Sequence, residues 1–310
     1  MTSPISRRSA MCRFIGGSAA LAAVGRIPNP SYTGSLTGSL AAAEPPAEVK
    51  LKGRINHSVC RWCFSKIPLD ELCKAAKTMG ITSIDLCGPK EWPALKKYGL
   101  TCAMANGAGM GIAQGFNRVE NHNKLVASFE ALIPKAAEAG LTNVICMSGN
   151  RKSLDNEQGP DDEQGLANCA IGLKRLMKTA EKHKVNVVME LLNSKKDHHD
   201  YQCDHTAWGA EVCRRVGSER CKLLYDIYHM QIMEGDLIAT IQKNIQYIAH
   251  FHTGGVPGRW IIDETQEIYY PAVMKAIAQT GYTGFVAQEF LPRGPKPLEE
   301  LRKSIQICDV

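Results

Sequence analysis

The 310-residue sequence lacks three features that would point to a membrane, a nucleic acid or a dinucleotide. No apolar run approaches the roughly 20 residues that cross a bilayer, so we expect a soluble mature protein without a membrane partner. The net charge of +6 is mild and the basic residues are scattered, which argues against a nucleic-acid partner. The Gly-rich segment 107–111 does not have the GxGxxG spacing of a dinucleotide site and is typical of an ordinary loop.

Cysteine is plentiful, with 12 residues, but it is not placed as in a disulfide or zinc framework. The segment Cys60-Arg61-Trp62-Cys63 is a CxxC, and no second pair follows at the spacing of a zinc site. Other cysteines stand where a small buried hydrophobic residue would serve, namely Cys73, Cys87, Cys102, Cys146, Cys169 and Cys213. We therefore interpret most cysteines as thiols of the core.

The first 43 residues differ in composition from the rest of the chain. Arg7 and Arg8 precede a short apolar stretch rich in Ala and Gly, residues 14–24, and small residues follow it. This order is typical of a bacterial twin-arginine export signal. We therefore predict a signal peptide over residues 1–43, a linker over residues 44–54, and an exported, periplasmic protein. A disordered basic tail on a cytoplasmic protein is the alternative.

Apolar, strand-like runs recur along residues 55–310. They are Ile55–Cys60, Ile84–Cys87, Cys102–Ala105, Val144–Met147, Val187–Leu192, Leu223–Tyr225, Ile248–Phe251 and Phe285–Phe290. Several are continuous rather than alternating, which is expected for parallel strands that helices cover on the outside.

Helix-like segments separate these runs. Leu125, Phe129 and Ile133 belong to one apolar face with the spacing of a helix. Glycines typical of helix ends precede several strands, at Gly80, Gly99, Gly140, Gly217 and Gly281. Eight strand-then-helix units without a long insertion favour a single (β/α)8 barrel, a TIM barrel, over a doubly wound sheet. We predict this catalytic domain over residues 55–310.

Polar side chains end the four late strands of the predicted barrel. Glu190, Asp226 and Glu289 each follow apolar residues, and the segment His250-Phe251-His252 supplies an imidazole. The carboxyl ends of barrel strands form the active face, and a charge there is costly unless it is paired or metal-bound. Three carboxylates and one imidazole suit a divalent ion such as Mn²⁺, Mg²⁺ or Co²⁺ better than a thiolate-preferring metal.

Four segments resemble motifs of the hydroxypyruvate isomerase family, within the xylose-isomerase-like barrel superfamily. They are Glu190–Ser194, Tyr225–Gln231, His250–Arg259 and Gln288–Phe290. The resemblance covers essentially residues 55–310, and Tyr225–Gln231 is its most distinctive part. It implies one divalent metal ion held by Glu190, Asp226, His252 and Glu289.

The chain departs from the family pattern at two positions. Hydroxypyruvate isomerases usually have Gln at the position of His252, whereas the related epimerases have His there, as this chain does. Trp260 stands at a position where a polar residue is usual. Both departures leave the substrate open.

Two further residues are candidates for substrate binding. His229 could bond a substrate hydroxyl or carbonyl, and Arg259 could hold a carboxylate with two hydrogen bonds. A structural histidine and a surface arginine are the alternatives. Weaker candidates near the early strands are His57, Arg61, Trp62 and Asn106, and Trp62 and Phe64 could wall the pocket or cover the mouth of the barrel. The polar loops 197–200 and 204–205 are interpreted as solvated, with a lid or a subunit contact as the alternative.

The resemblance implies an isomerase that interconverts hydroxypyruvate and tartronate semialdehyde, a small-molecule substrate pair. Glu190 and Glu289 would move a proton between neighbouring carbons through an enediolate while the metal ion polarises the carbonyl. A 3-epimerase or dehydratase of a sugar or cyclitol is the first alternative, which His252 favours. An endonuclease IV-like phosphodiesterase and a non-catalytic carbohydrate-binding protein are remote alternatives. A homo-oligomer is compatible with the sequence.

Overall fold

The computed structural model describes residues 50–152 and 159–310, which belong to one compact unit, Pro46–Val310. The predicted signal peptide, residues 1–43, and most of the predicted linker lie outside the described residues. Export and the leader boundary therefore stay predictions.

Seven parallel strands form one sheet, in the order β2-β1-β7-β6-β5-β4-β3. The strands are β1 (Asn56–Cys60), β2 (Ser83–Asp85), β3 (Asn143–Cys146), β4 (Asn186–Glu190), β5 (Cys221–Asp226), β6 (Ile248–Thr253) and β7 (Phe285–Gln288). Their side chains are almost all buried, because the helices cover the outside of the sheet and the strands enclose their own interior.

The segment 101–105 lies between β2 and β3, where the eighth strand of a barrel belongs. Parallel bridges join Thr101 to Ser83 of β2 and Ala105 to Val144 of β3. Between these bridges the hydroxyl of Ser83 accepts from the backbone N–H of Ala103 at 2.8 Å, in place of a ladder carbonyl. The predicted strand Cys102–Ala105 is therefore present but irregular. The sheet closes, and the predicted TIM barrel is confirmed.

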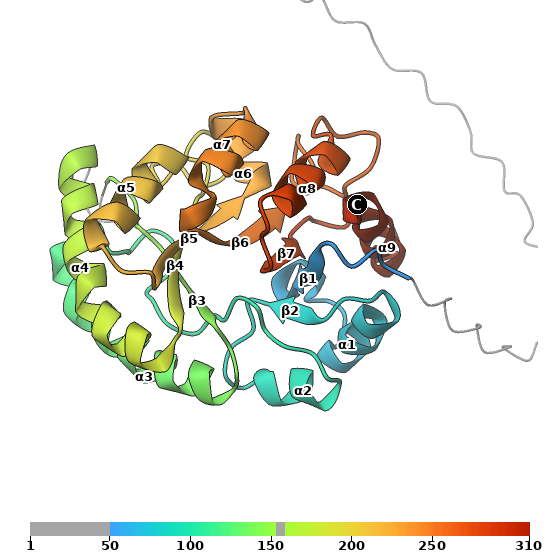
Figure 1. Ribbon diagram of the computed structural model, residues 1–310, viewed down its shortest axis with the longest axis horizontal. Coiled ribbons are helices and arrows are strands. Elements are labelled where there is room, and N and C mark those ends of the chain that lie inside the picture. The colour runs from blue at the N-terminus through green and yellow to red at the C-terminus, as the bar shows by residue number, and fades with distance from the viewer. Residues whose placement is uncertain (1–49, 153–158) are drawn as a thin grey trace, which may run out of the picture. The chain divides into compact units, whose positions relative to one another are not determined.

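Helices surround the strands (Figure 1). They are α1 (Leu69–Thr78), α2 (Trp92–Lys97), α3 (Val119–Glu138), α4 (Asp162–His183), α5 (Thr206–Val216), α6 (Ile227–Met233), α7 (Leu237–Asn244), α8 (Tyr270–Gln279) and α9 (Pro297–Cys308), with short 3₁₀ turns η1 (Arg61–Phe64) and η2 (Ile245–Tyr247). The predicted apolar face of α3 is buried. The five glycines predicted at helix ends all have positive φ, and Gly217 ends α5 with φ 74°.

The cysteines of the described residues are all free thiols. Ten of these eleven are buried and Cys63 is half-buried, which confirms the interpretation of most of them as core residues. Within the same part of the chain, no helix is both long enough and apolar enough to cross a bilayer.

Candidate metal and active site

The four predicted metal ligands meet at the carboxyl ends of β4 to β7. Glu190 and Asp226 are the last residues of β4 and β5, His252 lies in β6, and Glu289 follows β7. The parallel register of β5 and β6 places Asp226 beside His252. One ligand atom from each of the four buried residues lies within 4.8 Å of the others. The barrel therefore brings together all four side chains that the sequence singled out.

The carboxylates of this cluster lie so close together that a positive charge between them would stabilise it. Nδ1 of His252 lies 2.6 Å from Oε2 of Glu289 and 3.4 Å from Oε1 of Glu190. Burial raises the pKa of Asp226 to about 8 although Arg259 beside it acts in the opposite direction. Carboxylate oxygens and an imidazole are ligands for a hard or borderline divalent cation. The donor set therefore fits the predicted kind of ion.

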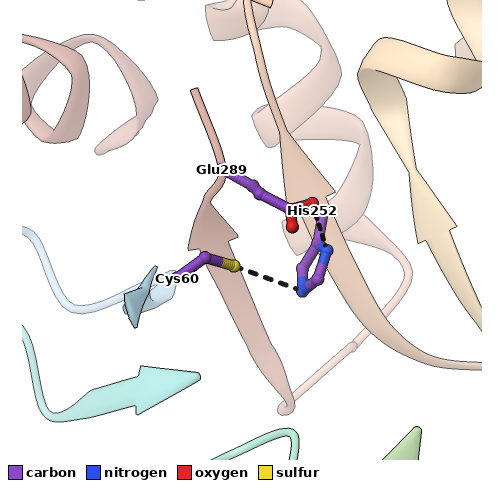
Figure 2. A group of neighbouring side chains, drawn as sticks. All are labelled: Cys60, His252 and Glu289. Atoms are coloured by element: carbon purple, nitrogen blue, oxygen red, sulfur yellow. Dashed lines mark hydrogen bonds and ion pairs between the residues drawn. The ribbon is translucent and has the colours of Figure 1, made fainter. Parts of the chain in front are cut away.

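Cys60 and Asp85 lie on the far side of the His252 ring. Figure 2 shows the ring between Cys60 and Glu289, with Nε2 3.6 Å from the Cys60 Sγ atom. Oδ2 of Asp85 lies 3.9 Å from the same nitrogen. A proton on Nε2 leaves the Nδ1 lone pair directed at the carboxylates, which is the form that binds a metal. Burial, with the charges of Glu289 and Asp85, raises the pKa of the Cys60 thiol well above its usual value, so Cys60 stays a neutral thiol.

A second buried pair, Asp85 and His250, lies next to this histidine. Oδ2 of Asp85 is 2.5 Å from Nε2 of His250, and its Oδ1 accepts from the hydroxyls of Ser58 and Ser83 at 2.7 and 3.0 Å. The rings of His250 and His252 pack edge to face, with centroids 5.2 Å apart. The sequence analysis missed Asp85, because only Ile84 separates it from the polar residues Thr82 and Ser83, and it does not follow an apolar run as the other acids do.

His229 lies in the first turn of α6, next to Asp226. Oδ1 of Asp226 caps this helix and accepts from the backbone N–H groups of Tyr228 and His229 at 2.8 and 3.2 Å. Burial, assisted by the charge of Arg259, holds the pKa of His229 well below its usual value. The amide of Asn193 donates to Nδ1 at 2.7 Å, so the ring proton lies on Nε2, 3.6 Å from Oδ2 of Asp226. Substrate binding by His229 stays a prediction.

Arg259 is held between two aromatic rings and two carboxylates. Its guanidinium lies 5.3 Å from the Trp62 ring centroid and 5.4 Å from that of Tyr228. Nη2 donates to Asp226 at 3.1 Å and to Glu289 at 2.5 Å. Arg259 is thus a member of the acidic cluster with only 12% of its side chain exposed, rather than a surface arginine, and its predicted contact with a substrate carboxylate stays a prediction.

A cavity of about 410 Å³ opens beside the cluster. Of the four predicted ligands, Glu190 and Glu289 line it, whereas Asp226 and His252 do not. Trp62 and Asn106 also line it, as does His198 from the loop interpreted as solvated, and the Trp62 indole donates to Oε1 of Glu289 at 2.6 Å. The interpretation as solvated is therefore wrong at His198, whose ring packs against His229 with centroids 5.2 Å apart. It is also wrong at Asp204 of the second loop, which is buried and accepts from Arg151 at 3.1 Å and from Ser194 at 2.6 Å.

The other weak candidates have structural contacts instead. Nε2 of His57 lies 3.7 Å from the carboxylate of Asp309. Arg61 donates to the backbone carbonyl of Phe64 at 2.8 Å, and the Phe64 ring packs edge-on against Phe290 at 5.8 Å. None of these three candidates lines the cavity.

A barrel with a cluster of acids at the carboxyl ends of its late strands is the arrangement of a TIM-barrel enzyme. Comparison with known proteins identifies the family of such barrels to which the chain belongs. A family model described as xylose isomerase-like TIM barrel matches residues 73–309. The chain belongs to this family.

Two curated relatives of the chain are named as isomerases. A 2-oxo-tetronate isomerase of Cupriavidus necator is 28% identical over 229 residues, which are 71% of this chain and 85% of that protein. A protein named putative hydroxypyruvate isomerase of Homo sapiens is 31% identical over 107 residues, 34% of this chain and 39% of its own. These relatives confirm the resemblance and the prediction of an isomerase.

A solved structure supports the fold. The 3-keto-D-glucoside 4-epimerase of E. coli superposes with a TM-score of 0.69 at 19% identity, and the match covers 81% of this chain and 98% of that one. At this identity the likeness extends to the barrel alone.

Proposed function

We propose that the protein is a metal-dependent isomerase that interconverts a hydroxy-ketone and a hydroxy-aldehyde through an enediolate, with hydroxypyruvate and tartronate semialdehyde as the first pair to test. The observation that carries this proposal is the division of the buried cluster. Glu190 and Glu289 line the cavity, whereas Asp226 and His252 belong to the same cluster and do not line it. Two carboxylates are thus placed to touch both the ion and a substrate.

The proposed ion is one Mn²⁺, Mg²⁺ or Co²⁺ held by Glu190, Asp226, His252 and Glu289. When bound there, such an ion polarises the substrate carbonyl and acidifies the adjacent C–H bond. The support for this assignment is the donor set, three carboxylates and one imidazole nitrogen within 4.8 Å of one another.

The side chains around Glu289 keep it ionised and able to accept a proton. Burial raises its pKa, but the charges of Arg259 and His252 outweigh this and hold the pKa well below its usual value. Trp62 donates to Oε1 and Arg259 to Oε2, which fixes the carboxylate at the cavity wall. Glu289 in this position removes the proton from the substrate carbon.

Glu190 reaches the same cavity from a different direction. Its strand, β4, is separated from β7 by β5 and β6, so the two glutamates approach a substrate from different strands of the barrel. In the aldose–ketose reaction one carboxylate takes the proton from the first carbon. The same or the other carboxylate delivers a proton to the neighbouring carbon, and the hydroxyl proton of the substrate moves from the hydroxyl oxygen to the former carbonyl oxygen.

A sugar or cyclitol 3-epimerase or dehydratase is the second candidate function. His252 favours it, because hydroxypyruvate isomerases usually have Gln at this position and the epimerases have His. Such an enzyme would begin with the same proton removal by Glu289.

Metal analysis and deuterium exchange test the proposal together. Purified protein should contain one divalent ion per chain. In D₂O it should incorporate deuterium into hydroxypyruvate or a ketose, measured by mass spectrometry. Glu190→Gln and Glu289→Gln should each lower exchange by at least ~10²-fold. The matched control Glu264→Gln, an exposed glutamate paired with Lys303, should not. Three zinc ions per chain would contradict the proposal and favour a phosphodiesterase.

A further inference from the structure

We propose that the physiological substrate carries an apolar group beside its hydroxy-carbonyl unit, and that one half of the cavity is the subsite for this group. The inference rests on the proposed function, because it concerns the same site. It deepens that function by naming the class of substituent.

The cavity has two chemically different halves. The half formed by the late strands contains Glu190, Glu289 and Arg259. The other half is formed by β3, by α3 and by the chain between β2 and α3, and we call it the early-strand half. Its side chains are mainly apolar and include Met110, Ile112, Phe116, Leu125, Phe129 and Met147. A ligand that fills the cavity therefore meets charge on one side and hydrocarbon on the other.

The volume of the cavity exceeds the needs of a three-carbon acid. A cavity of about 150 Å³ accommodates benzene, and a three-carbon hydroxy acid is of about the same size. The cavity here measures about 410 Å³, so such an acid would fill less than half of it. The remaining space is large enough for a phenyl ring or a short alkyl chain.

Two apolar side chains of the cavity are also exposed to solvent. Trp62 is 42% exposed and Ile112 is 37% exposed, and both line the cavity. Gly109 and Gly111, with φ of 102° and 90°, give the loop around Met110 and Ile112 a backbone conformation that residues with a Cβ rarely adopt. Exposed hydrocarbon at a concave site is typical of a binding surface.

The charges around the cavity disfavour a substrate carboxylate. Among the residues of the described chain that line it, Arg259 is the one Arg or Lys. Its Nη2 is bonded to Asp226 and Glu289, and aromatic rings lie close to its guanidinium. With the proposed ion bound, the charges of the acidic cluster are balanced, and a substrate carboxylate would still compete with Asp226 and Glu289 for Arg259. We therefore expect the apolar group to replace a carboxylate rather than accompany it.

A series of hydroxymethyl ketones, HOCH₂–CO–R, tests the inference with one constant reacting unit. R is carboxylate in hydroxypyruvate, hydroxymethyl in dihydroxyacetone, methyl in hydroxyacetone and phenyl in 2-hydroxyacetophenone. Enzyme loaded with Mg²⁺, Mn²⁺ or Co²⁺ is incubated with each compound in D₂O, and kcat/KM for exchange of the CH₂ protons is measured by mass spectrometry. Exchange by Glu289→Gln supplies the background. We expect the phenyl compound to exceed hydroxyacetone by at least ~10-fold, the low end for added hydrocarbon in an apolar pocket, and to exceed hydroxypyruvate.

A pair of isoleucine variants locates the subsite. Ile112→Ser removes hydrocarbon from the cavity, and Ile171→Ser changes an exposed isoleucine of α4 that does not line it. We expect Ile112→Ser to lower the ratio of the phenyl rate to the hydroxyacetone rate by at least ~3-fold, because less apolar surface is buried with the ring. Ile171→Ser should leave this ratio unchanged.

The outcomes separate the two proposals. Faster exchange of hydroxypyruvate than of the phenyl compound would overturn the inference and leave the isomerase proposal intact. If Ile112→Ser left the ratio of the phenyl rate to the hydroxyacetone rate unchanged, the subsite would not lie in the early-strand half of the cavity. Background rates with every member of the series would contradict the proposed function, and the inference with it.

Discussion

Glu289→Gln changes one carboxylate oxygen of the cluster into an amide nitrogen. In the protein Oε1 accepts from the Trp62 indole at 2.6 Å, and Oε2 accepts from Arg259 at 2.5 Å. Glutamine has one acceptor oxygen, so one of these two donors must face the amide N–H₂ group. Nδ1 of His252, 2.6 Å from Oε2, also loses a negatively charged neighbour.

These lost contacts set the expected size of the effect. An unsatisfied buried donor costs about 1–3 kcal/mol. Breaking a buried ion pair costs more, but Arg259 keeps Asp226 as a partner, so we expect the free energy of unfolding to fall by about 2–4 kcal/mol in total. For a chain of this length that corresponds to a Tm lower by roughly 5–15 °C. Because Gln cannot take the substrate proton, exchange should fall by at least ~10²-fold.

Thermal unfolding followed by circular dichroism and deuterium exchange in D₂O measure the two effects separately. Glu264→Gln, which removes an exposed charge paired with Lys303, is the control and should change neither. Near wild-type exchange by Glu289→Gln would refute its role as the base, and His229 would become the leading candidate. An unchanged Tm would refute the contacts with Trp62 and Arg259.

Three further predictions concern the metal ion, acid stability and export. Asp226→Asn and His252→Ala should each lower the metal content and the rise in Tm on adding metal, because an ion that binds only the folded state stabilises it. Full metal content in either variant would show that the replaced residue is not a ligand. Burial, against the effect of Asp309, lowers the pKa of His57 to about 4, so the unfolded chain binds a proton between pH 6.5 and 4 that the folded chain does not. Urea titrations should show the free energy of unfolding falling by about 3 kcal/mol as the pH drops through that window, and His57→Gln should lose less. Replacing Arg7 and Arg8 with Lys should leave the precursor in the cytoplasm with residues 1–43 attached, as cell fractionation and mass spectrometry would show. Uncleaved wild-type protein in the cytoplasm would contradict export.

Much of the barrel could be predicted because buried parallel strands are continuous apolar runs. The predicted run Val187–Leu192 overlaps β4, and Leu223–Tyr225 lies within β5. The same rule located the acids, because a carboxylate directly after buried residues must be at the open end of a strand or be paired. Glu190 and Asp226 meet both conditions.

Other parts depend on partners far away in the sequence and could not be predicted. The indole of Trp62 donates to Glu289 across 227 positions, and nothing local to either residue indicates this bond. The irregular eighth strand depends on the hydroxyl of Ser83 and the amide of Asn143, which bond the backbone of Ala103. Asp85 meets His250 only because β2 and β6 face the same interior, and that follows from closure of the barrel rather than from either strand alone.

The charges of the cluster explain why a divalent ion suits it better than a further basic side chain. Glu190, Asp226 and Glu289 together with Arg259 carry a formal excess of two negative charges when all are ionised. Without an ion, burial raises the pKa of Asp226 to about 8. Burial lowers the pKa of His252, but the charges of Glu289 and Glu190 outweigh it and hold that pKa well above its usual value. At neutral pH, therefore, the carboxyl group of Asp226 is protonated and the ring of His252 carries its second proton. These two protons balance the two excess negative charges of the cluster. Both residues must give up a proton to become ligands, so a doubly charged ion restores the same balance at the same place.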